Sequence, residues 1–352
     1  MVRPQGLFGL SVIKRHEFRA ARLPGGDGEI AFHLPLAGRM AFVGVAIVAL
    51  VLLPVAIYPI HLVKIACLAI FAASFNFLIG FVGIVSFGQA ALFGTGAYVT
   101  AHAMKVWMLS PEVALLLGVA SALVLGLAMG ALAIRRSGIY QAMITLAIAQ
   151  MVYFVYAQAP FTHGDDGIQS VPRGILFGLV DLSDDRAVYG LAVIALVVVF
   201  WGMRWLLSSR LGMILVAIRD DERRALSLGY NVYRYKLGAF AIAAAGAGLA
   251  GSISAIAFQL ATLSGAHWQL SGEAVLMALV GGIGTLSGPI VGAAIVAMMQ
   301  QILAPFGAWV LVIQGIVFVL CVLLFRDGLI SHLAGIPGLL GAYRGKADRT
   351  KA

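Results

Sequence analysis

The chain has 352 residues, of which 61% are hydrophobic and only 11% are charged, and its formal net charge is +9. A soluble domain carries roughly 25% charged residues, so this composition excludes an ordinary soluble globular protein. The apolar stretches are long and continuous, whereas the strands of a membrane barrel would alternate with a period of two. We therefore expect an all-α integral membrane protein.

The apolar stretches divide into ten candidate membrane spans. In chain order these are residues 40–58, 63–81, 85–104, 112–134, 139–158, 187–207, 237–258, 273–284, 289–303 and 308–325. The run from Gly272 to Leu303 is split at Gly281–Pro289, and its first piece is too short for a straight span. That piece either begins earlier, around His267, or is re-entrant. The expected organisation is a basic tail at 1–39, a transmembrane domain at 40–325 and a second tail at 326–352.

Basic residues are distributed unequally between the two sides of this ten-span arrangement. One side receives both tails, Arg135, Arg136 and the connection around 204–236, which together hold 20 of the 24 Lys and Arg residues. The other side holds only Lys64, Lys105, Arg173 and Arg186. The positive-inside rule therefore predicts that both termini and the loop at 208–236 are cytoplasmic. The positive charge mainly sets orientation, with anionic lipid headgroups as its neighbours, and does not indicate nucleic-acid binding.

Polar side chains and glycines cluster at membrane depth in the stretch Asn76–Tyr98. Asn76, Ser86 and Gln89 need partners there, either neighbouring helices or a water-lined path. The glycines of this stretch favour a broken helix, and broken helices are common at transport sites. A second break at Gly281–Pro289 contains Thr285. Asn76, Ser86, Gln89 and Thr285 are candidate lining residues of a translocation path, and the alternative is a hydrogen-bonded lock between helices.

Small residues recur on two faces of the span at 237–258. Ala244, Gly248 and Ser252 share one face, and Ala247, Gly251 and Ala255 share a neighbouring one. Such faces let helices approach closely in a membrane. Tight helix packing is the expected role, and a direct lining role in a pore is the alternative.

The connection at 208–236 contains a short predicted helix at about 221–228. Acidic residues come first, Arg223 and Arg224 follow, and Gly229 suits a left-handed C-cap. An ordered, capped helix in such a loop is the shape that a cytoplasmic partner could grip. On the opposite side, the stretch around Asp165 and Asp166 would by itself be an ordinary turn.

The sequence contains no signal for catalysis or for a bound cofactor. Its only Gly-Lys pair, Gly345-Lys346, lacks the other residues of a phosphate-binding loop, and the histidines show no paired spacing for metal ligands. No charged residue lies in the middle of a span, which argues against a proton- or ion-coupled carrier. We expect a transport protein that is not an enzyme and has no metal, cofactor or nucleotide site of its own.

The sequence resembles the permease subunits of bacterial branched-chain amino-acid ABC importers, of the LivM type. The resemblance covers nearly all of the chain after residue 40. It is carried by the stretches Asn76–Tyr98, Gly164–Ile168, Ile218–Asn231, Arg234–Lys236 and Gly281–Pro289. It implies that the loop at 208–236 docks on an ATPase subunit, with Glu222, Ala225 and Gly229 as the matching positions. The position of Gln89 is often His in relatives, so the substrate can differ from that of the family.

The resemblance also implies a complex in the bacterial inner membrane. Its other members would be a second permease of the LivH type, two ATP-binding cassette subunits and a periplasmic solute-binding protein, which Asp165 and Asp166 would face. The same kind of permease could serve urea, short amides or aromatic acids instead of leucine, isoleucine and valine. An ATP-independent channel or secondary carrier is the alternative from another class.

Overall fold

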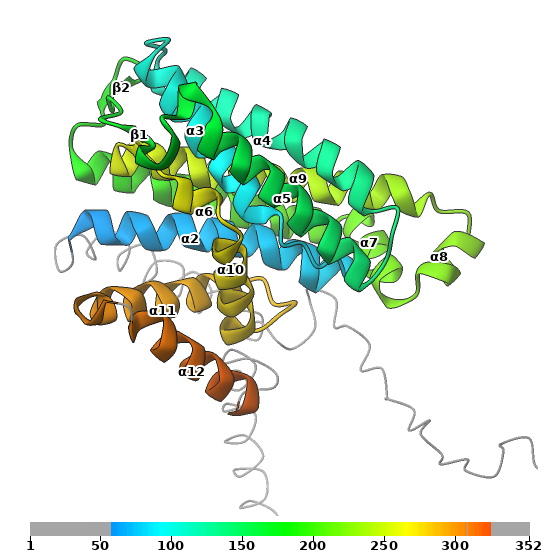
Figure 1. Cartoon of the computed structure of the whole chain (residues 1–352). Helices are drawn as coiled ribbons and strands as arrows, with labels where there is room; N and C mark the ends of the chain where they lie inside the picture. The colour runs from blue at the N-terminus through cyan, green and yellow to red at the C-terminus, as the bar shows by residue number, and fades with distance from the viewer. Residues whose placement is uncertain (1–57, 308, 325–352) are drawn as a thin grey trace, which may run out of the picture.

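The computed structural model describes residues 58–307 and 309–324, which form a bundle of helices (Figure 1). The expected span 40–58 and both tails lie outside the described residues. The longer helices are α2 (Pro59–Asn76), α3 (Gln89–Lys105), α4 (Pro111–Ala133), α5 (Ile139–Gln158), α6 (Asp185–Ser208), α7 (Arg210–Asp220), α9 (Val232–Phe258), α10 (Trp268–Gly281), α11 (Gly288–Leu303) and α12 (Trp309–Leu324). The shorter ones are the π-helical η1 (Phe77–Val82), the helix α8 (Glu222–Ser227) and the 3-10 turns η2 (Pro160–Thr162), η3 (Gly164–Asp166), η4 (Leu263–Ala266) and η5 (Ala304–Phe306).

Every expected span except the first coincides with a helix of the described part of the chain. Among the described residues, five helical segments are long and apolar enough to cross a membrane: Pro59–Val82, Pro111–Ala133, Ile139–Gln158, Asp185–Ser208 and Val232–Phe258. A total of ten spans stays a prediction. Helix α10 begins at Trp268 with His267 as its N-cap, which confirms that this helix starts earlier than residue 273.

Helices α2 and α9 lie at the core of the bundle. Burial covers 89% of the apolar segment of α2–η1 and 72% of that of α9, but only 28% for α5 and α6. The outer helices therefore expose apolar side chains such as Leu116, Val198 and Trp201. Such faces suit a lipid environment, where an exposed apolar side chain costs nothing.

The two small-residue faces of α9 pack against different helices. A Cβ on Gly126 of α4 would lie 2.2 Å from Ala244 Cβ, and a Cβ on Gly251 would lie 1.9 Å from the carbonyl oxygen of Phe93 on α3. The second glycine therefore admits no side chain. This contact confirms the expected role of these faces in close helix packing.

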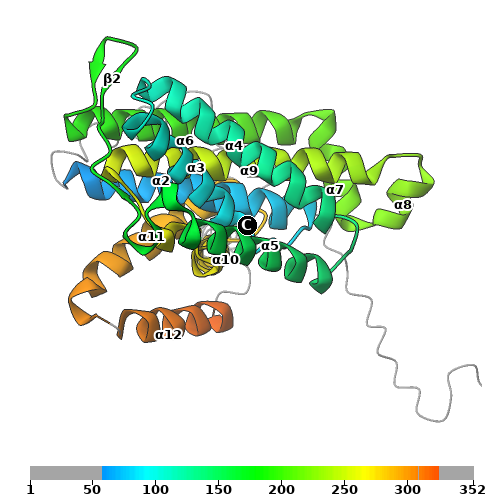
Figure 2. The same cartoon turned by 45° about the horizontal axis from the view of Figure 1, so that its top comes forward.

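Helices α10 and α11 form an antiparallel hairpin against α2. Gln300, near the end of α11, donates a hydrogen bond to Glu273, near the start of α10 (Nε2 to Oε2, 3.0 Å). A Cβ on Gly292 would lie 1.8 Å from the carbonyl oxygen of Met277, so the two helices meet backbone to backbone. Helix α12 contacts α10 and α11, and in both views it lies apart from the main bundle (Figures 1 and 2).

The bundle has two distinct ends. Helices α7 and α8 lie at one end and the short strands lie at the other (Figures 1 and 2). Strand β1 (Ile168–Gln169) pairs antiparallel with β4 (Leu260–Ala261), with Ile168 opposite Ala261. Strand β2 (Ile175–Leu176) pairs with β3 (Val180–Asp181), with Ile175 opposite Asp181. These ends are called the α8 end and the strand end below.

Candidate translocation and coupling sites

Asn76 joins the end of α2 to the turn between α10 and α11. Its Nδ2 donates to the carbonyl oxygen of Thr285 (2.8 Å), and its Oδ1 accepts from the backbone N–H of Gly284 (3.1 Å). The side chain is 2% exposed. The structure thus brings together Asn76 and Thr285, which lie more than 200 residues apart in the sequence. The buried side-chain amide of Asn76 provides hydrogen-bond partners for two backbone groups of the turn.

Both breaks in helical structure meet at this contact. Helix α2 continues as the π-helical η1 and ends at Gly83, which adopts a left-handed conformation (φ 76°). The turn after α10 contains Gly282 (φ 114°) and Gly284 (φ 79°). A Cβ on Gly80 would lie 2.6 Å from the nitrogen of Gly284. The glycine-containing turn after α10 and the π-helical η1 therefore lie in contact inside the bundle. Single π-helical turns are frequent at functional sites.

Ser86 lies in the connection just before α3, Gln89 is the first residue of α3, and both are fully buried. Ser86 Oγ accepts a hydrogen bond from the backbone N–H of Gly88 (3.3 Å). Neither Oε1 nor Nε2 of Gln89 has a hydrogen-bond partner among the described residues. A buried polar group without a partner costs about 1–3 kcal/mol. Gln89 is therefore the one of the four candidate path residues whose polar atoms stay available for a water or a solute.

Helix α8 is capped at both ends by its own sequence. Asp221 is the N-cap, and its Oδ1 accepts from the backbone N–H of Arg224 (3.0 Å). At the other end Gly229 has φ 85°, its N–H donates to Leu226 O (3.0 Å), and Tyr230 N–H donates to Ala225 O (3.2 Å). These two bonds are those of a Schellman motif. The predicted helix at about 221–228 and its glycine C-cap are confirmed.

The helix α7 precedes α8 and was not predicted as a separate element. Helix α6 ends at Ser208, and α7 starts again at Arg210 after extended backbone at Ser209 (ψ 170°). A Cβ on Gly212 would lie 2.3 Å from the carbonyl oxygen of Leu207, so this glycine makes the tight turn possible. The loop at 208–236 is thus a pair of helices and not a single helix in an irregular connection.

The structure assigns different surroundings to the candidate coupling residues Glu222 and Ala225. Glu222 accepts a hydrogen bond from Lys236 on α9 (Nζ to Oε2, 2.7 Å), which ties α8 to the bundle. Ala225 is 4% exposed and packs with Ile218 and Val232. Its methyl group therefore packs within this chain, and a role of Ala225 in coupling stays a prediction. On α8 and at its C-cap, the exposed apolar side chains are Leu226 (55%) and Leu228 (71%).

Arg219 connects the α8 end to the helix breaks. This residue lies near the end of α7, and its Nη1 donates to the carbonyl oxygen of Gly80 in η1. It also pairs with Asp220 (Nη2 to Oδ1, 3.0 Å). A Cβ on Gly83 would lie 2.8 Å from Arg219 Cγ. The side chain of Arg219 therefore fills the space beside the left-handed turn that ends η1.

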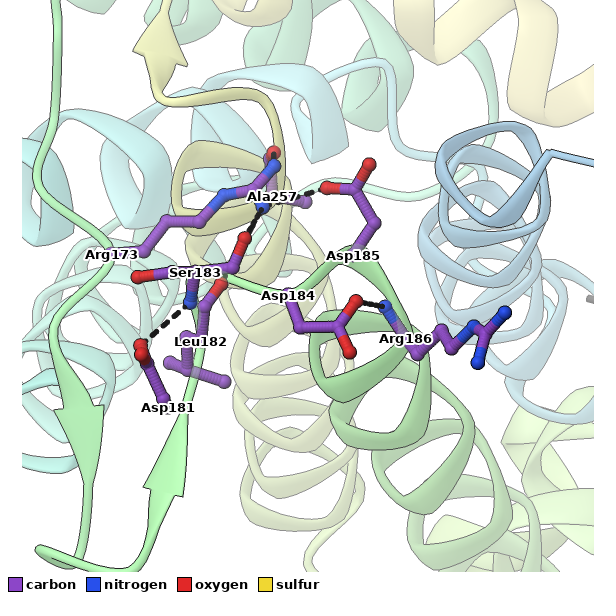
Figure 3. Close-up of polar contacts among 8 residues, drawn as sticks. All are labelled: Arg173, Asp181, Leu182, Ser183, Asp184, Asp185, Arg186 and Ala257. Atoms are coloured by element: carbon purple, nitrogen blue, oxygen red, sulfur yellow. Dashed lines mark hydrogen bonds and ion pairs between the residues drawn. The ribbon is translucent and has the colours of Figure 1, made fainter.

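At the strand end, Arg173 fastens the long connection between α5 and α6 to two helices (Figure 3). Its Nη1 pairs with Asp185 Oδ1 at the start of α6 (2.7 Å), and its Nη2 donates to the carbonyl oxygen of Ala257 at the end of α9 (2.8 Å). A cation suits the negative end of a helix, and a carboxylate suits the first turn. The backbone N–H of Ser183 donates to Asp181 (2.9 Å), which holds the pKa of that carboxyl below its usual value.

Asp165 and Asp166 lie in η3, inside a turn with left-handed residues on both sides. Both side chains are exposed at the strand end. The turn packs closely against β4, because a Cβ on Gly167 would lie only 2.2 Å from the carbonyl oxygen of Ala261. Within residues 58–307 and 309–324, no three His, Cys, Asp or Glu side chains gather as a metal site.

Three residues of these sites were not singled out from the sequence: Arg219, Lys236 and Arg173. Each was counted among the basic residues that set orientation, and none was given a contact of its own. A signal for Lys236 was present, since it and Glu222 both lie in the stretches that carry the family resemblance. Nothing in the spacing indicated that Arg219 reaches Gly80, because 139 residues separate the two.

Residues 59–322 match the family described as branched-chain amino acid transport system / permease component. The high-affinity branched-chain amino acid transport system permease protein LivM of Escherichia coli (strain K12) is 27% identical over 286 residues, with 72% of this chain and 65% of that protein covered. LivM of Salmonella typhimurium (strain LT2) matches with the same identity and coverage. The chain thus spans just under two thirds of the length of these relatives. No solved structure matches it.

Proposed function

Because this chain belongs to the family of permease components of branched-chain amino acid transport systems, we propose that it is a transmembrane subunit of an ATP-driven importer for leucine, isoleucine and valine. A permease component is not itself an enzyme. In this proposal the chain works with a second permease of the LivH type, two ATP-binding cassette subunits and a periplasmic solute-binding protein. It lies in the bacterial inner membrane with both termini in the cytoplasm and the strand end outside.

The observation that carries the proposal is the capped helix α8. It lies at the α8 end of the bundle, at the opposite end from the strands and the acidic turn (Figure 1). Its two caps and the Glu222–Lys236 ion pair hold it in one orientation. Leu226 and Leu228 expose apolar surface beside it, next to Arg223 and Arg224. In a loop outside lipid, such a rigid apolar patch fits contact with another protein.

The contacts of Arg219 support a mechanical route from this helix to the interior. A movement of α8 would displace α7, whose Arg219 holds the carbonyl oxygen of Gly80. Gly80 in turn packs against Gly284, beside the hydrogen bonds of Asn76. ATP-driven closure of partner subunits could thereby shift the two breaks between two arrangements, as packed helices switch in discrete steps. Ser86 and Gln89 would line the solute route at the start of α3, with Asn76 and Thr285 holding its gate.

The test is reconstitution of transport with defined components. The full-length chain is co-purified with a second permease and two ATPase subunits, placed in proteoliposomes and supplied with the binding protein. We expect ATP-dependent uptake of radiolabelled L-leucine, reduced by unlabelled isoleucine and valine. Uptake that proceeds without ATP would identify a channel or secondary carrier. Selective uptake of urea, a short amide or an aromatic acid would show that the importer serves that solute and not branched-chain amino acids.

A further inference from the structure

The strand end contains a cavity that shares only Asp165 with the candidate sites. Its volume is about 730 Å³, within the range of roughly 300–1,000 Å³ that is usual for small-molecule sites. Its walls come from α2, α3, α5, α9, α10, α11 and the connections η3 and η4. The cavity therefore lies where the bundle and the acidic turn meet.

The charged side chains of this cavity carry both signs. Lys64 on α2 and Glu273 on α10 line it, and Lys64 is near enough to Glu273 for an electrostatic interaction. The two nevertheless form no ion pair within 4.0 Å, and among the described residues Lys64 pairs with no other acid. Glu273 is partly satisfied by Gln300, which also lines the cavity. A cation and a carboxylate thus face one space without neutralising each other directly.

Two further features extend this pattern. Asp165 adds a second carboxylate from η3. The N-cap residue His267 and Gln269 in the first turn of α10 line the wall, and the positive end of a helix favours a carboxylate there. The ring of His267 is held by an edge contact with Tyr153 (centroids 5.1 Å apart).

The same cavity also has an apolar side. Leu68, Leu263, Leu270 and Phe93 line it, from α2, η4, α10 and α3. A ligand that satisfies the whole wall therefore needs an anionic group, a cationic group close to it and an aliphatic body. A zwitterionic α-amino acid with a branched aliphatic side chain has these three parts.

We propose that this cavity is a binding site for such an amino acid within the permease itself. Lys64 and the start of α10 bind the ligand carboxylate, Glu273 and Asp165 bind its ammonium group, and the leucines hold its side chain. The proposal rests on the proposed function, because the strand end must face the side from which the solute arrives. It adds a binding site on the solute's path, which the solute reaches before the buried polar residues of α3.

The test is direct binding of L-leucine to the full-length chain in lipid nanodiscs, without a binding protein. We expect saturable binding, and 4-methylpentanoate and 3-methylbutylamine, which are leucine without its ammonium group and without its carboxylate, should compete at least about tenfold more weakly. Lys64→Gln and Glu273→Gln should each raise the Kd for L-leucine about tenfold or more. The second change retains an acceptor for Gln300. Glu112→Gln, which removes a carboxylate at the same end but outside the cavity, should leave the Kd unchanged.

The proposal is wrong if the wild-type chain shows no saturable binding, or if both cavity variants bind L-leucine as the wild type does. Thermal unfolding of each variant in the same nanodiscs shows whether it is folded, and Lys64→Arg should restore most of the affinity. The transport assay separates the two proposals. If ATP-driven leucine uptake is preserved but Lys64→Gln and Glu273→Gln leave leucine binding unchanged, only the cavity site is contradicted. Charge-dependent leucine binding without leucine uptake contradicts the proposed function alone.

Discussion

The guanidinium of Arg219 on α7 donates a hydrogen bond to the backbone carbonyl oxygen of Gly80 in the π-helical end of α2. This contact joins the helix pair at the α8 end to the place where both breaks in helical structure meet. The side chain of Arg219 is only 24% exposed, so the contact is largely shielded from water. It gives the proposed coupling a defined physical link.

The Arg219 link predicts an uncoupling variant. Arg219→Met keeps an unbranched side chain beside Gly83 but removes the donor to Gly80 O. We expect the complex to assemble and to retain basal ATP hydrolysis, while leucine uptake per ATP hydrolysed falls severalfold. The matched control is Arg210→Met at the exposed start of the same helix, which removes no hydrogen bond or ion pair among the described residues. Equal coupling ratios in the two variants would show that Arg219 does not transmit movement.

Asn76 should be important for stability as well as for transport. Asn76→Ala leaves Gly284 N–H and Thr285 O without their buried partner, which is expected to cost about 1–3 kcal/mol. The measurement is the thermal unfolding midpoint of the purified chain in detergent. Ser74→Ala, which removes only a bond to Ile70 O in the same helix, is the control. A midpoint no lower for Asn76→Ala than for Ser74→Ala would remove Asn76 as the lock between α2 and the α10–α11 turn.

The C-cap of α8 predicts a strong effect of side-chain shape at Gly229. Gly229→Val places a β-branched residue at φ 85°, which is a genuine outlier, so the exit from α8 should rearrange. Substrate-stimulated ATP hydrolysis and uptake should fall together, while membrane insertion stays normal. Gly238→Ala on α9, where a methyl group meets open space, should have no effect. Normal stimulation in the Gly229→Val complex would mean that α8 orientation does not matter for coupling.

Orientation can be checked by labelling. A cysteine at Arg224 in the α8 region should react with a membrane-impermeant reagent only from the cytoplasm. A cysteine at Leu179, which is 88% exposed at the tip of the β2–β3 hairpin, should react only from outside. Both substitutions are made in a Cys67→Ala, Cys321→Ala background. Labelling of position 224 in intact cells would contradict the topology inferred from the basic residues.

The helices and the cap of α8 were predictable because their causes are local. Long apolar runs force helices in lipid, and Asp221 and Gly229 mark the two ends of α8 within nine residues of sequence. The buried polar residues of the path could also be selected one by one, since a polar group at membrane depth is unusual. Which of these residues contact each other could not be predicted, because Asn76 meets Thr285 only after α2 and the α10–α11 hairpin have packed together.

The side chains that link or line sites were missed for a similar reason. Lys64 and Glu273 lie near the ends of their spans, where a charge reaches water easily and needs no special explanation. Only the tertiary structure shows that the two face one cavity. The burial of Ala225 could not be predicted either, because it depends on how α8 packs against Ile218 and Val232.

Photo-crosslinking can show whether α8 meets an ATPase subunit in the assembled complex. A photoreactive phenylalanine analogue replaces Leu228 in the full-length chain, and the chain is expressed with its partner subunits and irradiated in native membranes. We expect a covalent adduct with an ATP-binding subunit whose yield changes when ATP is added, and no such adduct from the same analogue at Leu179. An adduct with the ATP-binding subunit from position 179, or none from either position in an assembled, transporting complex, would show that α8 is not the contact with the ATPase.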